Sequence, residues 1–174
     1  MTIQETDIPP PNGTHADKTL MWLKICIGTG FGVGFLPKMP GTFGSAIVLL
    51  PALFPSTNTT FFFVCLATAA FLLGLWVVPV LETAWGNDPS RVVIDEILGM
   101  SLVLATPVVP HSWGWLVLAF MLFRLFDITK PYPINRINAR QGAFFVMFDD
   151  IIASFYALLT LHGAWLIYQL FENR

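Results

Sequence analysis

The charged stretch RLFDITKPYPINRINARQGAFFVMFDD, residues 124–150, lies between two apolar runs, residues 113–123 and 151–171, and the rest of the chain is arranged around it. It carries four of the nine lysines and arginines and three of the eleven acids. Charges between segments of this hydrophobicity are costly unless they pair, bind an ion or lie at the water interface. We therefore expect this stretch to form the floor of an active site.

The composition is that of an integral membrane protein with short loops. Hydrophobic residues make up 55% of the 174 residues, charged residues 11%, and the mean hydropathy is +0.69. A soluble domain carries about 25% charged residues. The net charge of −2 gives no basic surface for nucleic acid, and the length suits one domain.

Apolar segments predict an all-α, polytopic membrane bundle with about four to five spanning or re-entrant helices. Residues 61–81 contain no charge, and a span needs about 20 such residues. The other segments expected to cross the membrane are residues 43–54, 97–109, 113–126 and 151–171.

The start of the chain differs from these segments. Residues 1–18 are polar and rich in proline, and we expect a disordered cytosolic tail there, followed by a single membrane-embedded domain over residues 19–174. Within residues 20–36 every second position from 28 to 34 is glycine, which disfavours a stable helix. We interpret this segment as interfacial or re-entrant.

The basic residues predict the orientation. With the N-terminus in the cytosol and the five segments crossing in turn, the outside loops, residues 55–60 and 110–112, contain no lysine or arginine. Only Arg174 then lies outside, whereas the other eight basic residues lie on the cytosolic side. Such an excess is typical of cytosolic loops.

The same topology brings five carboxylates to one depth. Asp95 and Glu96 start one helix, Asp127 ends another, and Asp149 and Asp150 start a third. Acids this close cannot all ionise without a counter-charge, and hard oxygen ligands suit Mg²⁺. The alternative is that the acids at helix starts only complement the helix dipole.

Basic and polar groups near these acids suit a phosphate. Lys38, Arg124 and Lys130 could offset charge on phosphoryl oxygens. Thr42 lies in the turn PGTFGS, residues 40–45, where it is a plausible helix N-cap and where free backbone N–H groups could bind phosphate. The alternatives are a glycine close-packing role for this turn and a local ion pair between Arg124 and Asp127.

The histidines and cysteines narrow the chemistry. His15, His111 and His162 lie away from the predicted acidic cluster, which argues against a histidine nucleophile. Neither Cys26 nor Cys65 has an arginine six residues later, as a cysteine-phosphatase loop would require, and the sequence has no Asp-x-Asp motif. A metal-activated water or a single aspartate attacking a phosphate remains.

Four motifs occur in order along the chain: PGTFGS at residues 40–45, DEILG at 95–99, RLFDITKPYP at 124–133 and MFDD at 147–150. Together they resemble the phosphatidylglycerophosphatase A family over about residues 20–170. One departure is GAFFVM, residues 142–147, which is less glycine-rich than that family's pattern.

The resemblance implies a multi-pass enzyme of the bacterial inner membrane with a cytosolic active site and a phosphatase domain dependent on Mg²⁺. It would hydrolyse the phospholipid phosphatidylglycerophosphate to phosphatidylglycerol and inorganic phosphate. It also implies metal and catalytic roles for Asp95, Glu96, Asp127, Asp149 and Asp150. As catalytic residues we single out Asp95, Asp149 and Asp150, with Asp149 or Asp150 as the base for water.

Two alternatives stay open at this point. One is a phosphatase of another lipid phosphate, such as phosphatidic acid. The other is a small cation-binding transporter, which should carry acids near the middle of the membrane rather than at helix ends.

Overall fold

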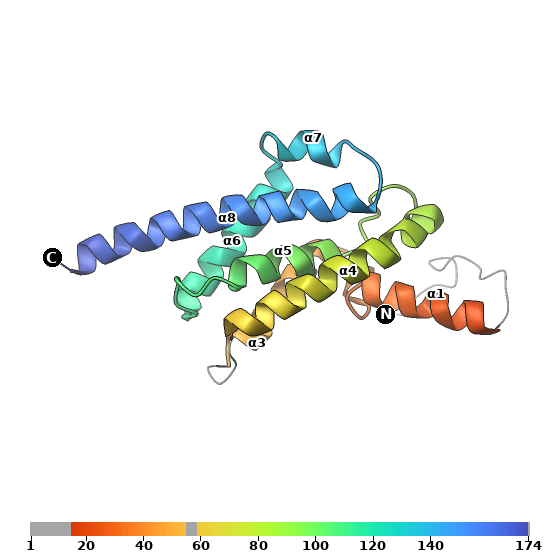
Figure 1. The fold of residues 1–174 in the computed structure, drawn as a ribbon, viewed down its shortest axis with the longest axis horizontal. Helices are drawn as coiled ribbons and strands as arrows, with labels where there is room; N and C mark the ends of the chain where they lie inside the picture. The colour runs from red at the N-terminus through yellow and green to blue at the C-terminus, as the bar shows by residue number, and fades with distance from the viewer. Residues whose placement is uncertain (1–14, 55–58, 174) are drawn as a thin grey trace.

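A computed structural model describes residues 15–54 and 59–173, and every regular element in these two ranges is helical (Figure 1). The elements are α1 (His15–Gly28), the 3₁₀ turn η2 (Val33–Phe35), α2 (Pro40–Ile47), α3 (Leu49–Ala52), α4 (Thr59–Trp85), α5 (Ile94–Leu104), α6 (Trp113–Thr129), α7 (Ile134–Asn138) and α8 (Ala143–Glu172). The all-α prediction is confirmed.

The short helix α5 is the centre of the bundle. It packs against α2, α4, α6 and α8, and Figure 1 shows it between the two longest helices, α4 and α8. Most of its residues are buried, including Asp95 in its first turn. Because other helices surround α5, its acidic first turn lies inside the protein.

A close approach of three helices fixes α5 against its neighbours. The Ser154 hydroxyl on α8 lies 2.8 Å from the Gly99 carbonyl oxygen on α5 and 2.6 Å from that of Asp150. A Cβ atom on Gly99 would lie 2.5 Å from the ring of Phe123 on α6. The absence of a side chain at Gly99 therefore sets how closely α5, α6 and α8 approach.

This packing predicts the effect of adding one methyl group. We expect Gly99→Ala to lower the free energy of unfolding by about 1–3 kcal/mol, because the buried Phe123 ring must move to admit the Cβ atom. Gly163→Ala on α8 is the matched control, since no atom lies within 4 Å of its added Cβ. Thermal unfolding in detergent should separate the two variants, and equal midpoints would contradict this account of the packing.

The long apolar helices match the prediction best. The segment predicted at residues 61–81 is α4, which extends a few residues further at each end. Helix α6 begins at Trp113 as predicted. Helix α5 begins at Ile94 with Asp95 and Glu96 in its first turn, but it ends at Leu104, before Pro107.

The helix predicted at residues 43–54 is two short helices, and the predicted N-cap is wrong. Helix α2 begins at Pro40, and Met39 occupies the N-cap position. Proline suits this first position because its φ is already helical and it has no N–H to satisfy. Thr42 therefore lies within the first turn of α2. The helix is interrupted at Val48, which lies between α2 and α3.

The expectation that Asp149 and Asp150 start the last helix is also wrong. Helix α8 begins at Ala143, after Gly142 with a φ of 108°, so both acids lie in its second turn. The Asp149 carboxylate has partners from outside α8, described below. The short helix α7, between α6 and α8, was not predicted.

The N-terminal region is partly helical. Residues 1–14 of the predicted tail lie outside the described residues, whereas residues 15–18 belong to α1, so the prediction of disorder is wrong for them. After α1 the backbone turns through Gly30 and Gly32, which have φ values of 56° and 93° that favour glycine. Whether residues 20–36 lie in the membrane interface stays a prediction.

Much of the helical surface is apolar. Residues Thr60–Trp85 and Ala143–Glu172 form helices long and apolar enough to cross a membrane, with mean hydropathies of 2.5 and 1.8. Large apolar side chains are exposed on both helices and on α6, among them Leu72, Met121 and Leu170. Apolar surface on this scale marks contact with a membrane or a partner. The number of spanning helices stays a prediction.

Candidate active site

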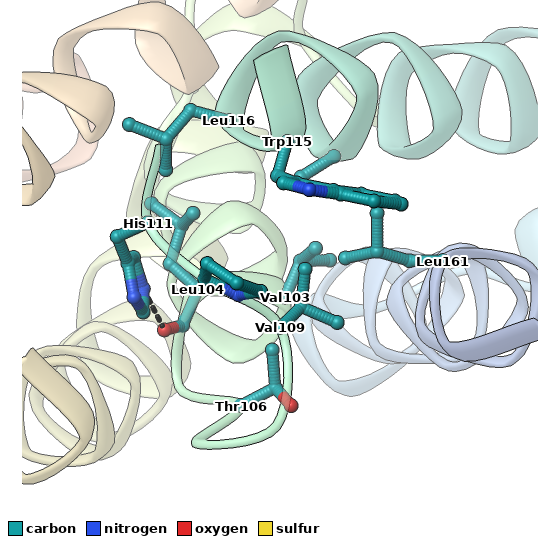
Figure 2. Close-up of a pocket in the computed structure, with 10 residues that line it drawn as sticks. Val103, Leu104, Thr106, Val109, His111, Trp115, Leu116 and Leu161 are labelled. Carbon is teal, nitrogen blue, oxygen red and sulfur yellow. Dashed lines mark hydrogen bonds between the residues drawn. The ribbon is translucent and has the colours of Figure 1, made fainter. Parts of the chain in front are cut away.

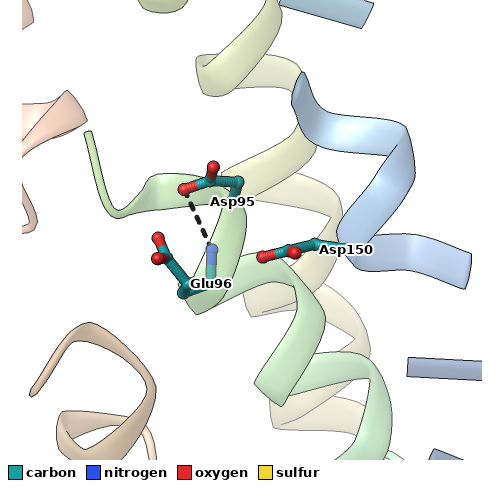
Figure 3. Close-up of side chains that lie close together, drawn as sticks. All are labelled: Asp95, Glu96 and Asp150. Atoms are coloured by element: carbon teal, nitrogen blue, oxygen red, sulfur yellow. Dashed lines mark hydrogen bonds between the residues drawn. The ribbon is translucent and has the colours of Figure 1, made fainter. Parts of the chain in front are cut away.

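Three carboxylates from two helices converge at the start of α5. Figure 3 shows the Asp150 side chain reaching from α8 towards Asp95 and Glu96. One ligand oxygen from each lies within 4.8 Å of those of the other two. Asp95 Oδ1 accepts the backbone N–H of Glu96 at 3.1 Å, which fixes the orientation of the Asp95 carboxylate. Oxygens grouped this closely can share one small cation.

A fourth carboxylate, Asp127 near the end of α6, is paired with an arginine. The Arg124 guanidinium lies 2.5 Å from Asp127 Oδ2 and 3.7 Å from Glu96 Oε1. The same guanidinium lies 3.5 Å from the hydroxyl of Ser45 on α2. The predicted i,i+3 ion pair exists, and Arg124 in addition connects α6 with α2 and α5.

The fifth carboxylate, Asp149, is hydrogen-bonded on both oxygens. Its Oδ2 accepts from Lys130 Nζ at 2.5 Å and from Asn138 Nδ2 at 3.0 Å. Its Oδ1 accepts the backbone N–H of Asp150 at 3.0 Å. The Asn138 amide also lies 3.2 Å from Asp88 Oδ2. Asp149 therefore fixes Lys130 at the edge of the carboxylate cluster.

The cluster contains more acidic than basic groups. If all five predicted acids were ionised, the two cations, Arg124 and Lys130, would leave three negative charges unbalanced. Burial raises the pKa of Asp95 well above its ordinary value and that of Glu96 to about 8, because removal from water disfavours the ionised form. Burial would lower the pKa of Lys130, but the bond to Asp149 and the negative charges of Asp149, Asp150 and Asp127 together outweigh it and raise that pKa. A bound cation would let the acids stay ionised.

Four buried polar atoms at this site have no hydrogen-bond partner among the described residues. Two are carboxylate oxygens, Glu96 Oε2 and Asp150 Oδ2, and two belong to groups that can donate, Arg124 Nε and Thr42 Oγ1. Buried polar atoms are normally paired because leaving one unpaired costs about 1–3 kcal/mol. Two unpaired oxygens fit a metal ion, and two donors fit a phosphate oxygen, so the residues fit both groups.

Helix α2 closes one side of the site with a glycine. A Cβ atom on Gly41 would lie 1.8 Å from Glu96 Oε1 and 3.3 Å from an Arg124 nitrogen. The Ser45 hydroxyl bonds back to the Gly41 carbonyl oxygen at 2.9 Å. The turn at residues 40–45 is thus in close contact with the acids, which supports the close-packing alternative. The next residue, Thr42, carries the unpaired hydroxyl.

The structure brings most of the predicted site together. The residues in or beside the cluster are Asp95, Glu96, Asp127, Asp149, Asp150, Arg124, Lys130 and Thr42. Lys38 is exposed on the loop before α2, outside the group of paired charges. Three other arginines lie over aromatic rings instead: Arg91 over Phe35 and Trp85, Arg136 over Tyr132, and Arg140 over Phe145.

Sequence reasoning did not find two polar members of the site, Asn138 and Ser45. Asn138 stands close to Asn135 in the same charged stretch, and only the rotation of α7 distinguishes the two. Ser45 is buried and ends the motif PGTFGS, so its position in that motif was the available signal.

His111 and His162 lie near the C-terminal end of α5 and take no part in the site. His111 bonds to the Leu104 carbonyl oxygen at 2.9 Å and lines a small, mostly apolar cavity with Thr106 (Figure 2). His162 bonds to the Thr106 hydroxyl at 2.9 Å. Thr106 and His111 follow the C-terminus of α5, and His162 on α8 bonds to Thr106, whereas the acids lie at the N-terminus of α5. The prediction that these two histidines lie away from the acids is confirmed.

Known proteins similar to this chain are named as lipid phosphatases. The family model described as phosphatidylglycerophosphatase A matches residues 26–165. A Bacteroides thetaiotaomicron protein, named a candidate phosphatidylinositol-3-phosphatase, is 38% identical over 84% of this chain and 96% of its own. Proteins named phosphatidylglycerophosphatase A are 35% identical in Haemophilus influenzae (78% of this chain, 84% of theirs) and 30% in Escherichia coli (73% and 74%). No solved structure matches.

Proposed function

The chain belongs to the phosphatidylglycerophosphatase A family and is a phosphatase, and on that premise we propose that it hydrolyses phosphatidylglycerophosphate to phosphatidylglycerol and inorganic phosphate. The observation that carries the proposal is the group of four unpaired buried atoms. It combines carboxylate oxygens for a metal with donors for a phosphate. A phosphomonoester on a lipid headgroup presents the matching oxygens.

The residues that would hold Mg²⁺ are Asp95, Glu96 and Asp150. Their oxygens converge, two of them lack partners, and the cluster needs positive charge. Bound Mg²⁺ supplies Lewis-acid polarisation of the phosphate and a more acidic water. Arg124 contacts both Glu96 and Asp127, so Asp127 lies next to these three acids. We propose that its negative charge also attracts the metal ion.

The donors proposed for the phosphate are Arg124, Lys130 and Thr42. The Arg124 Nε and Thr42 Oγ1 atoms are buried without partners, and Lys130 is only partly buried beside Asp149. Fixed donors of this kind stabilise charge that develops on phosphoryl oxygens. The exposed Lys38 is proposed to contact the phosphate as the headgroup enters.

The attacking water must give its proton to a base, and Asp149 and Asp150 differ in how well they can accept it. From the described residues Asp150 accepts no hydrogen bond at Oδ2, and a carboxylate that gives one oxygen to a metal can accept a proton on the other. Both Asp149 oxygens already accept hydrogen bonds, so Asp149 is better suited to orient Lys130 and the Asp150 backbone. We assign the base role to Asp150 on this ground.

We place the enzyme in the bacterial inner membrane as a multi-pass protein with the site at the cytosolic face. The apolar surfaces of α4, α6 and α8 support membrane embedding, and the bias of basic residues supports the orientation. A transporter is less well supported, because the described acids of α4 and α8 lie near helix ends, at Glu82, Asp149, Asp150 and Glu172.

A second substrate class is a phosphoinositide. The relative from Bacteroides thetaiotaomicron, which matches most of this chain, is named a candidate phosphatidylinositol-3-phosphatase. Both substrates carry a phosphomonoester on a lipid headgroup, so the same metal and donors could serve either. The headgroups differ in size, which an assay can resolve.

Phosphate release by the purified protein tests the substrate. The assay compares phosphatidylglycerophosphate, phosphatidic acid and phosphatidylinositol-3-phosphate in mixed micelles with Mg²⁺. We expect kcat/KM to be highest for phosphatidylglycerophosphate. A higher value for either of the other lipids would reassign the substrate, and no release from any of them would contradict the proposed function.

A further inference from the structure

An apolar groove lies beside the candidate site, between the two longest helices. It has a volume of about 300 Å³ and is lined from α4 by Val64, Thr68 and Phe71, from α5 by Leu98 and Leu102, and from α8 by Ile151. This volume is at the lower end of the range for ligand pockets, about 300–1,000 Å³. No charged group lines it.

The one hydroxyl in the groove does not require a polar ligand. Thr68 Oγ1 donates to the Val64 carbonyl oxygen of its own helix at 2.8 Å. The hydroxyl is therefore satisfied within α4, and every other residue that lines the groove is apolar. Its occupant should be a hydrocarbon, because a polar group there would lose its hydrogen bonds.

Two helices carry both groove residues and members of the carboxylate cluster. Ile151 follows Asp150 directly on α8, and Leu98 lies three residues after Asp95 on α5. From Asp95 to Leu102 the helix rises about 10 Å, so the groove leads away from the acids along the bundle. It opens between α4 and α8, the two helices long and apolar enough to cross a membrane.

We propose that this groove binds one acyl chain of the phospholipid whose phosphate occupies the carboxylate site. The inference rests on the proposed function, since it takes the headgroup to be at the acids. An apolar groove that lies a few residues from the carboxylates, between the two helices apolar enough to cross a membrane, suits a flexible chain. A helix of a second copy is about 10 Å across and would need a broader surface. The enzyme then recognises the lipid by its chain as well as its phosphate.

Filling the groove tests the proposal. Thr68 and Val64 are exposed, so the larger side chains of Thr68→Phe and Val64→Phe should fill the groove without disturbing the core. Ala69→Phe, the adjacent exposed position outside the groove, is the matched control. The assay measures KM for phosphatidylglycerophosphate with long acyl chains and for its deacylated headgroup.

We expect both groove variants to raise KM for the long-chain lipid about tenfold, as the loss of about two buried methylenes predicts. Their KM for the deacylated headgroup and their kcat should match wild type, as should both constants of Ala69→Phe. Unchanged KM for the long-chain lipid, or an equal rise for both substrates, would overturn the proposal. A change in oligomeric mass with unchanged KM would identify the groove as a contact between copies, and would overturn it as well.

A binding measurement separates this inference from the proposed function. Phosphatidylglycerol with a photoactivatable group in one acyl chain should label α4 and α5 peptides that line the groove, and Thr68→Phe should remove most of that label. Labelling that is indifferent to Thr68→Phe would contradict the groove even in an active enzyme. Specific labelling in a protein that releases no phosphate would support the groove while contradicting the proposed activity.

Discussion

Asp150→Asn is expected to lower kcat for phosphate release by about 10³-fold, within the range that removal of a general base produces. Asp150 contributes one of the three converging carboxylates and the unpaired Oδ2 atom, so the amide removes a metal ligand and the proposed base together. The rate of phosphate release from phosphatidylglycerophosphate, at saturating lipid and Mg²⁺, measures the effect.

The fold should survive this change. The cluster already has more acids than cations, so loss of one buried negative charge should leave the unfolding midpoint unchanged or raise it. Glu172→Gln, an exposed acid near the end of the same helix, is the matched control and should keep the wild-type rate. A kcat for Asp150→Asn within tenfold of wild type would remove Asp150 from the chemistry.

Asp149 is a less informative target than Asp150. Its substitution would leave Lys130 without its ion pair and Asn138 without one of its two acceptors. Stability and activity would then fall together. Only the structure shows this difference between Asp149 and Asp150, because in the sequence they are simply two adjacent acids.

Arg124→Lys is expected to lower kcat/KM by about 10²–10³-fold, the cost of losing one preorganised donor to a developing charge. Lysine keeps the positive charge near Asp127 and Glu96 but has no Nε–H and cannot donate in the planar arrangement of a guanidinium. Phosphate release at limiting lipid concentration measures the change.

Arg140→Lys provides the matched control for this substitution. Arg140 is exposed and lies over the Phe145 ring rather than at the acids. It should keep wild-type kcat/KM. If the two variants behaved alike, Arg124 would serve only as a structural partner of Asp127, and the phosphate donors would have to lie elsewhere.

The sequence was sufficient to predict the helices with uninterrupted apolar runs. Helix α4 follows the charge-free run at residues 61–81 closely, because nothing within it competes with the helix. Local signals misled where they depended on one residue. Thr42 looks like an N-cap, but Pro40 starts α2 two residues earlier. Asp149 and Asp150 look like a helix start, but α8 begins six residues before Asp149, whose carboxylate is paired with Lys130, just after α6, and with Asn138 on α7.

The membership of the site was predictable, but its internal pairing was not. The acids lie at or near the ends of predicted helices, so the sequence places them at a similar depth in the membrane. The pairing of Lys130 with Asp149 connects the end of α6 with α8. The contact of Gly41 with Glu96 connects α2 with α5. Such contacts depend on how helices rotate against one another, which apolar periodicity alone leaves open.

The central claim is that the carboxylates at the start of α5 and on α8 hold a divalent cation that phosphate release requires. Its most direct test is release of phosphate from phosphatidylglycerophosphate by the purified wild-type protein, with Mg²⁺ and after chelation. The account predicts rapid release with Mg²⁺, none after chelation, and recovery when Mg²⁺ is added back. Release that continues unchanged in chelator would contradict it.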